Sequence, residues 1–190
     1  MKTTKEEMPL APLPPVFSDI YPLDESYAAR GEAAPVIDRV EMNEVPEPYH
    51  SLLVHKTDMT STLEKFYGEI LHVEVLTRDL RENEYCREVV LVLDDTKKRV
   101  EFGAIKIFLD LFPAEARQEI LRAQQPLGRI LNLFNIPFAS RPRAFLRLTS
   151  DKFIDTALRL QWPQLLYGRS NSLVDSRERP LAEIVEILPP

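Results

Sequence analysis

The sequence predicts an α+β domain in which a single antiparallel sheet carries helices on one side. Three consecutive segments, residues 72–80, 85–94 and 100–109, alternate apolar with polar residues or are rich in β-branched residues, as antiparallel strands are. Short polar turns connect them, and the flanking segments have helical spacing. The length of 190 residues is typical of one compact domain.

Composition and charge exclude several classes of protein. Apolar residues make up 44% of the chain and charged residues 28%, and the net charge is -6 without any run of Lys and Arg. We therefore expect no nucleic-acid partner. No window approaches the roughly 18 apolar residues of a membrane span, and no signal-peptide core is present near residue 1. The single cysteine, Cys86, excludes an internal disulfide, so we expect a cytoplasmic protein.

The N-terminal segment, residues 1–45, contains six prolines between acidic and small residues. Such a composition resists packing into regular elements. We therefore predict an extended N-terminal arm over residues 1–45 and one folded domain over residues 46–190.

The folded domain is predicted to begin with two helices separated by a polar turn. Apolar side chains recur there at near-helical spacing, at Leu52, Leu53, Leu63, Phe66 and Tyr67. Thr57 or Asp58 is the candidate cap of the second helix. The three strands named above follow.

After the third strand, Pro113 is placed to start a helix of about three turns and Pro126 to stop it. The chain is then expected to return to the sheet, with strand-like patterns in residues 145–150, 172–176 and 181–188. Residues 150–170 are ambiguous, because Asp151 can cap a helix but the step from Trp162 to Pro163 must end it.

Arg87 is the strongest candidate for a ligand-binding or catalytic residue. It lies in a predicted strand in which residues 89–93 are all apolar and look buried, and an unpaired buried charge costs several kcal/mol. Its neighbour Glu88 points to the other face of the strand, so another carboxylate must meet Arg87. Two alternatives remain open: a structural ion pair, or a clamp for a ligand carboxylate, which the guanidinium fork suits well.

Glu186 is the second candidate, since it lies in a strand that is apolar on both faces. Glu183 is three residues away and therefore faces the opposite side. A carboxyl in apolar surroundings has a raised pKa, which would suit hydrogen bonding to a substrate hydroxyl or proton exchange. The alternative is an edge-strand Glu in water.

Two further short segments have both a structural and a functional interpretation. The turn at residues 126–129 can direct backbone N–H groups at an anion, and Gly128 permits a positive φ. It can equally be a plain turn whose Arg129 is ion-paired or faces solvent. In residues 58–60, Asp58 can be only a helix cap and Met59 only core filler.

No signature of metal, covalent or nucleotide chemistry is present in the sequence. His50, His55 and His72 lack metal-ligand spacing, and neither an HExxH motif nor a serine-nucleophile motif occurs. The chain has five glycines and no phosphate-binding glycine motif. We therefore predict neither a metal nor another cofactor.

Taken together, five ordered segments resemble chorismate pyruvate-lyase, which splits chorismate into 4-hydroxybenzoate and pyruvate. These are DMT at 58–60, CRE at 86–88, PLGR at 126–129, LYGRSNSL at 166–173 and VEILPP at 185–190. The similarity runs from about residue 52 onwards. It is greatest to the divergent branch of the family rather than to its ubiquinone-pathway enzyme.

The resemblance implies a six-stranded antiparallel sheet with a buried pocket beneath helical flaps. It also implies that Arg87 and the backbone near Met59 and Leu127 hold the product's carboxylate, while Glu186 meets the ring hydroxyl. Arg87 and Glu186 would then be the catalytic residues, chorismate the substrate, and no cofactor would be needed. The oligomeric state stays open.

Two departures from the family keep other functions open. The N-terminal arm is longer than the family's enzyme needs, and residues 141–164 replace a shorter stretch. A sister lyase that forms another hydroxybenzoate is one alternative. A non-catalytic sensor is another, because the fold resembles the effector-binding domain of certain transcription regulators, although no helix-turn-helix pattern precedes the core here. An interaction protein that docks through its proline-rich arm is the third.

Overall fold

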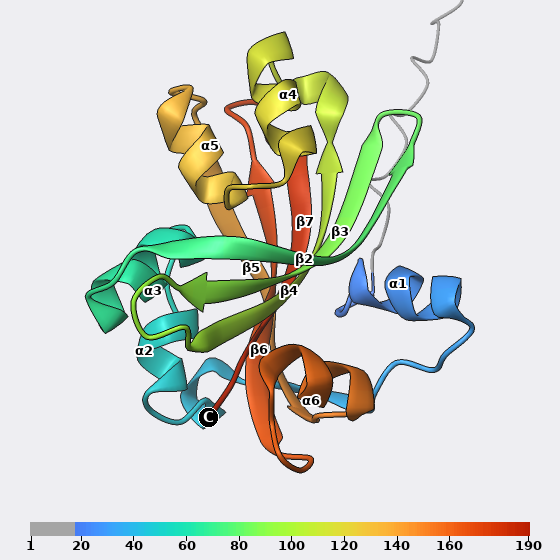
Figure 1. Cartoon of the computed structure of the whole chain (residues 1–190), viewed down its shortest axis with the longest axis vertical. Coiled ribbons are helices and arrows are strands. Elements are labelled where there is room, and N and C mark those ends of the chain that lie inside the picture. Colours follow the sequence, from blue (N-terminus) through green and yellow to red (C-terminus); the bar gives the residue numbers. More distant parts are fainter. Residues whose placement is uncertain (1–17) are drawn as a thin grey trace, which may run out of the picture.

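The computed structural model describes residues 18–190, and within them a single antiparallel sheet has the strand order β1-β5-β6-β7-β4-β3-β2 (Figure 1). The strands are β1 (Ile37–Val40), β2 (Leu71–Arg81), β3 (Glu84–Leu93), β4 (Arg99–Phe108), β5 (Ala139–Thr149), β6 (Leu165–Val174) and β7 (Pro180–Leu188). The predicted α+β class with one antiparallel sheet is confirmed.

Helices cover both faces of the sheet. They are α1 (Leu23–Arg30), α2 (Tyr49–Leu53), α3 (Met59–Tyr67), α4 (Ala114–Arg122), α5 (Leu127–Leu133) and α6 (Lys152–Leu158), with short 3-10 helices at Met42–Glu44 and Leu109–Leu111. Helices α1 and α6 lie on one face and α2 to α5 on the other (Figure 1). Their apolar side chains pack against the sheet. The prediction of helices on one side is wrong, because β3, β4 and β7 are buried on both faces and each face needs cover.

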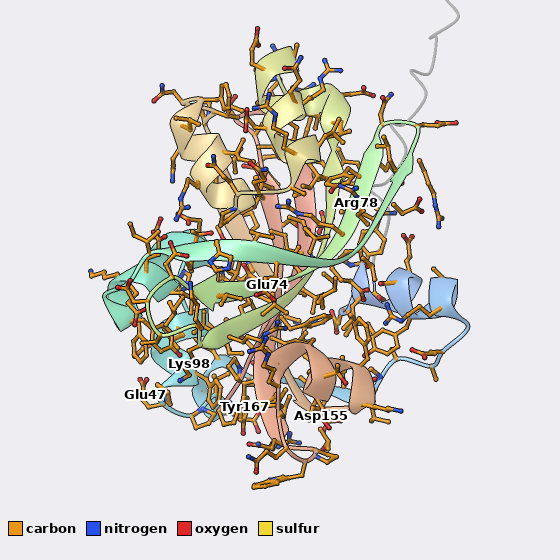
Figure 2. All side chains as sticks on the ribbon, viewed as in Figure 1. Glu47, Glu74, Arg78, Lys98, Asp155 and Tyr167 are labelled. Carbon is orange, nitrogen blue, oxygen red and sulfur yellow. The ribbon has the colours of Figure 1, made fainter. Side chains whose placement is uncertain are left out.

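Side chains fill the space between the sheet and the helices on both faces, where they form three apolar clusters (Figure 2). Tyr167, labelled there on β6, lies beside α2, where its ring is 5.0 Å from that of Tyr49. None of the helices in residues 18–190 is long and apolar enough to cross a membrane.

Two predicted caps are confirmed. The Asp58 side chain accepts a hydrogen bond from the Ser61 N–H at 2.9 Å and begins α3. The Asp151 side chain does the same for the Ile154 N–H at 2.9 Å and begins α6. Each carboxylate satisfies a backbone donor that the first helical turn leaves without an acceptor.

The prediction of an extended arm over residues 1–45 is wrong for its described part, which contains a helix and a strand. Residues 1–17 lie outside the described part of the chain, but residue 18 begins a folded segment. Leu23 and Tyr27 of α1 are fully buried against the sheet. Pro22 and Pro35 flank this helix and do not interrupt it, so the proline content did not prevent regular structure.

Strand β1 also comes from the predicted arm. It pairs antiparallel with β5, so that Ile37 is opposite Leu148. The described sheet therefore has one strand more than the six that the resemblance implies.

The segment after Pro126 is a helix, not a return to the sheet. Leu127, Ile130 and Leu131 are all buried, and this spacing gives α5 an apolar face against the core. Gly128 lies inside the first turn of α5 and does not have the positive φ that the turn interpretation allowed.

Candidate functional site

A cavity of about 60 Å³ lies between the central strands and the first turns of α3 and α5, which is several times the space that one water molecule needs. All four residues that the resemblance implies, Met59, Arg87, Leu127 and Glu186, line this cavity. They come from α3, β3, α5 and β7, so only the tertiary structure brings them together.

Strand register explains why Arg87 and Glu186 share a face. Ile105 on β4 is the partner of Arg87, and Gly103, two residues earlier on β4, is the partner of Glu186. Because side chains alternate along a strand, Gly103 and Ile105 lie on one face, and so do their partners. We call this the cavity face.

Arg87 is buried on the cavity face, and no counter-charge from residues 18–190 meets it. Its Nη2 donates to the Gln125 carbonyl at 3.3 Å, while its Nε and Nη1 are buried and have no hydrogen-bond partner. Burial lowers the pKa of Arg87, and the interaction with nearby Tyr85 opposes this effect. Among residues 18–190, no carboxylate forms an ion pair with Arg87.

Glu88 points to the opposite face, as predicted. Both of its carboxylate oxygens accept hydrogen bonds from Arg30 Nη1, at 2.8 and 2.7 Å. It is therefore unable to neutralise Arg87. Of the two alternatives that the sequence left open for Arg87, the structural ion pair is not formed within the described chain.

Glu186 has a cationic partner that the sequence interpretation did not identify. Arg169, its register partner on β6, is fully buried and forms an ion pair with it. Glu183 lies on the opposite face, as predicted, where it accepts a hydrogen bond from Ser172 Oγ at 2.7 Å. The expectation of a Glu186 carboxyl surrounded only by apolar groups is wrong, because β6 supplies a cation from outside the local sequence.

Arg169 also holds the loop between α2 and α3. Its Nη1 donates to the carbonyls of Leu53 at 3.1 Å and His55 at 3.2 Å, and its Nη2 to that of Thr57 at 3.5 Å. This single side chain thus links Glu186 to the loop that precedes Met59. Its signal in the sequence was its place in the LYGRSNSL segment at 166–173, which overlaps a stretch of ambiguous secondary structure.

Glu101 is a third carboxyl at the site, and sequence reasoning missed it. It lines the cavity and is only 4% exposed. Burial raises the pKa of Glu101 well above its usual range, the charge of Glu186 raises it further, and Arg169 opposes both. Its only signal in the sequence was an acidic residue inside an apolar strand.

The two helical segments of the resemblance meet at the cavity wall. Met59 and Leu127 are the first residues of α3 and α5, so their N–H groups have no acceptor within their own helices. Arg129 is ion-paired with Glu64 of α3 and donates to the Leu71 carbonyl at 3.2 Å, which is one of the two alternatives left open for it.

Unsatisfied polar atoms gather around this cavity. Within the described chain, Nε and Nη1 of Arg87, Oε2 of Glu101 and Nδ2 of Asn171 are buried without hydrogen-bond partners. Buried polar groups are nearly always satisfied, so this cluster fits a site for a polar molecule. No set of three or more His, Cys, Asp or Glu side chains in residues 18–190 is arranged to hold a metal ion.

Comparisons with known proteins show the fold. No sequence family matches the chain, and neither does any curated protein. Among solved structures, PhnF from Mycobacterium smegmatis matches with a TM-score of 0.56 and 12% identity over 72% of this chain. This chain covers 65% of PhnF. A gene product of Staphylococcus aureus matches with a TM-score of 0.53 and 6% identity, over 72% of this chain and 90% of its own.

A weaker match is the ligand-binding domain of a proposed GntR-family transcriptional regulator from Bordetella bronchiseptica. Its TM-score is 0.43 and its identity 9%, over 62% of this chain and 83% of that domain. At these identities, the matches to PhnF and to the Staphylococcus aureus protein establish a shared fold and do not extend to an activity.

Proposed function

We propose that the cavity binds a small cyclic carboxylate and that Arg87 binds the carboxylate group. The observation that carries this proposal is a buried guanidinium with two unpaired nitrogen atoms beside a cavity. Leaving such a charge unpaired costs several kcal/mol, and a ligand anion removes that cost. The planar fork of arginine matches a carboxylate with two parallel hydrogen bonds.

The rest of the cavity suits a ring with a hydroxyl group. Val89, Leu91, Ile105 and Ile184 provide apolar walls, as in most small-molecule sites. Glu186, held by Arg169, presents carboxylate oxygens that accept a hydrogen bond from a ring hydroxyl.

The finer proposal is that the ligand is chorismate and that the protein eliminates pyruvate to leave 4-hydroxybenzoate. Its support is that Met59, Arg87, Leu127 and Glu186, which come from four separate segments of the resemblance, line one cavity. Aromatisation of the ring drives this reaction. Positioning of the substrate's two carboxylates in a site closed to bulk water would supply much of the rate. A sister lyase would use the same groups to form another hydroxybenzoate.

A non-catalytic binding module is the second candidate. The ion pair between Arg169 and Glu186 favours it, because it holds Glu186 as a carboxylate. Glu186 can then accept a hydrogen bond from a ligand, and Arg87 can bind the ligand's carboxylate, without any proton transfer. Such a protein would bind hydroxylated ring carboxylates and release them unchanged.

One experiment separates these functions. Purified protein is titrated with 4-hydroxybenzoate by calorimetry and incubated with chorismate, and products are identified by chromatography. Arg87→Met should weaken binding by about 10- to 100-fold, the value of charge-assisted hydrogen bonds, while the exposed control Arg177→Met should not.

Release of 4-hydroxybenzoate and pyruvate from chorismate supports the lyase, and a different hydroxybenzoate supports a sister lyase. Binding without turnover supports the non-catalytic module. If the wild type binds neither compound, or if Arg87→Met binds as well as the wild type, the proposed function is wrong.

A further inference from the structure

The carboxyl group of Glu101 lies over Gly103 on the cavity face. It occupies space that is open because glycine has no side chain. A Cβ atom on Gly103 would lie 3.1 Å from Glu101 Oε1 and 3.4 Å from Cγ2 of Val89. Gly103 is the register partner of both Val89 and Glu186. The Glu101 head group therefore reaches the middle of the cavity face, close to Glu186.

Within residues 18–190, Glu101 forms no ion pair. The charged groups that act on it are Glu186 on β7 and Arg169 on β6, while Arg87 on β3 and Asp58 at the start of α3 also line the cavity. Arg169 is already engaged by Glu186 and by backbone carbonyls, and Arg87 forms no ion pair within the described chain. Two fully ionised carboxylates beside one arginine would leave an uncompensated buried charge, which is strongly unfavourable.

We propose that Glu101 determines specificity by donating, as a neutral carboxylic acid, a hydrogen bond to the oxygen of a ligand hydroxyl whose proton Glu186 accepts. This inference rests on the proposed function and deepens it, because it assigns a second residue, beside Glu186, that recognises the ligand hydroxyl. A ligand without that hydroxyl leaves the Glu101 carboxyl unsatisfied and gives Glu186 one hydrogen bond fewer, which a buried site penalises. Oε2 of Glu101, which is buried without a partner, is the atom available to this ligand.

The first test compares the dissociation constants of benzoate and 4-hydroxybenzoate by calorimetry. In the wild type we expect a ratio of about 10 to 100 in favour of 4-hydroxybenzoate, which corresponds to one or two buried hydrogen bonds. Glu101→Leu should lower this ratio about tenfold, whereas Glu101→Gln, which keeps a donor, should hold it within about threefold. Glu183→Gln, a buried Glu on the opposite face, is the matched control and should keep the wild-type ratio.

The second test measures protonation directly and does not depend on how well Glu101→Leu folds. The infrared spectrum of the wild type near pH 7 should contain the carbonyl band of a protonated carboxylic acid, and Glu101→Gln should lose it. Failure to bind either benzoate or 4-hydroxybenzoate would overturn the proposed function, and this inference with it. If both ligands bind but Glu101→Leu keeps the wild-type ratio, or the band survives in Glu101→Gln, only this inference is overturned.

Discussion

A Cβ atom on Gly128 would lie 2.8 Å from Oδ1 of Asp58, so the first turn of α5 packs against the cap of α3 with no room for a side chain. The Asp58 carboxylate is not free to move aside, because it accepts hydrogen bonds from the N–H and hydroxyl of Ser61. This contact sets Met59 and Leu127 side by side at the cavity wall.

Gly128→Ala should therefore destabilise the protein by about 1–3 kcal/mol through overpacking. Urea unfolding of a double-mutant cycle with Asp58→Gly measures the effect. Glycine is tolerated at a helix cap and removes the clashing atoms, so Gly128→Ala should cost less in that background. An equal cost in both backgrounds would show that the clash with Asp58 is not the cause.

Arg87→Met should make the free protein more stable. The change removes a buried guanidinium without a counter-charge and leaves an apolar side chain of similar length, so we expect a gain of about 1–3 kcal/mol in the free energy of unfolding. The control is Arg169→Met, which leaves Glu186 as an unpaired buried charge and should lose about 3–5 kcal/mol. If both variants lose stability alike, Arg87 has a structural role.

Arg169→Met should also loosen the loop before α3. The carbonyls of Leu53, His55 and Thr57 would lose a shared donor, so local opening becomes easier. Hydrogen exchange followed by mass spectrometry should show faster exchange in peptides covering residues 53–60, while α6 peptides serve as the control. Unchanged exchange in residues 53–60 would mean that the loop is held by other contacts.

The pH dependence of stability should identify Glu101. Its pKa is higher in the folded protein than in the unfolded chain, because of burial and then the charge of Glu186. The folded state therefore keeps a proton that the unfolded state releases. The stabilisation is fully present below the unfolded pKa of about 4.5 and is lost, by up to about 1.4 kcal/mol per pH unit, as the pH rises to the folded pKa.

Urea unfolding of the wild type and Glu101→Gln between pH 5 and 9 tests this dependence. The wild type should lose stability relative to the variant as the pH rises. The difference between the curves isolates Glu101, because His55, whose pKa burial lowers, and Glu183, whose pKa burial raises, are present in both proteins. Parallel curves would contradict a raised pKa for Glu101.

Arg30→Ala should destabilise the protein without affecting the cavity. Arg30 binds both oxygens of Glu88 and lies over the rings of Tyr27 and Phe153, at 4.4 and 4.1 Å from their centroids. Its loss leaves Glu88 buried and unpaired, which we expect to cost about 2–4 kcal/mol. The affinity for 4-hydroxybenzoate, measured below the unfolding temperature, should change less than twofold, because these residues lie on the opposite face.

Local sequence rules predicted much of the site. The period of two along a strand placed Arg87 and Glu88, and likewise Glu183 and Glu186, on opposite faces. The residue types favoured as helix caps identified Asp58 and Asp151. These predictions succeeded because each depends on neighbours within a few residues.

Other features depend on segments that are distant in the chain. Arg169 meets Glu186 through the register of β6 with β7, and Glu101 approaches Glu186 across Gly103. Neither pairing leaves a local pattern. The helical form of residues 127–133 was missed for a related reason, since a short apolar run fits a strand or a helix until its packing partner is known.

By itself, the sequence determined the α+β class, the alternation of side chains within each strand, the caps of α3 and α6, and the need of Arg87 for a partner. These follow from backbone periodicity and from the free energy of burying a charge. Only the tertiary structure decided that no carboxylate within residues 18–190 meets Arg87, that Arg169 neutralises Glu186, and that Glu101 lies in the cavity. The physical reason is that a charge's partner is set by strand register and helix packing, which join residues far apart in the chain.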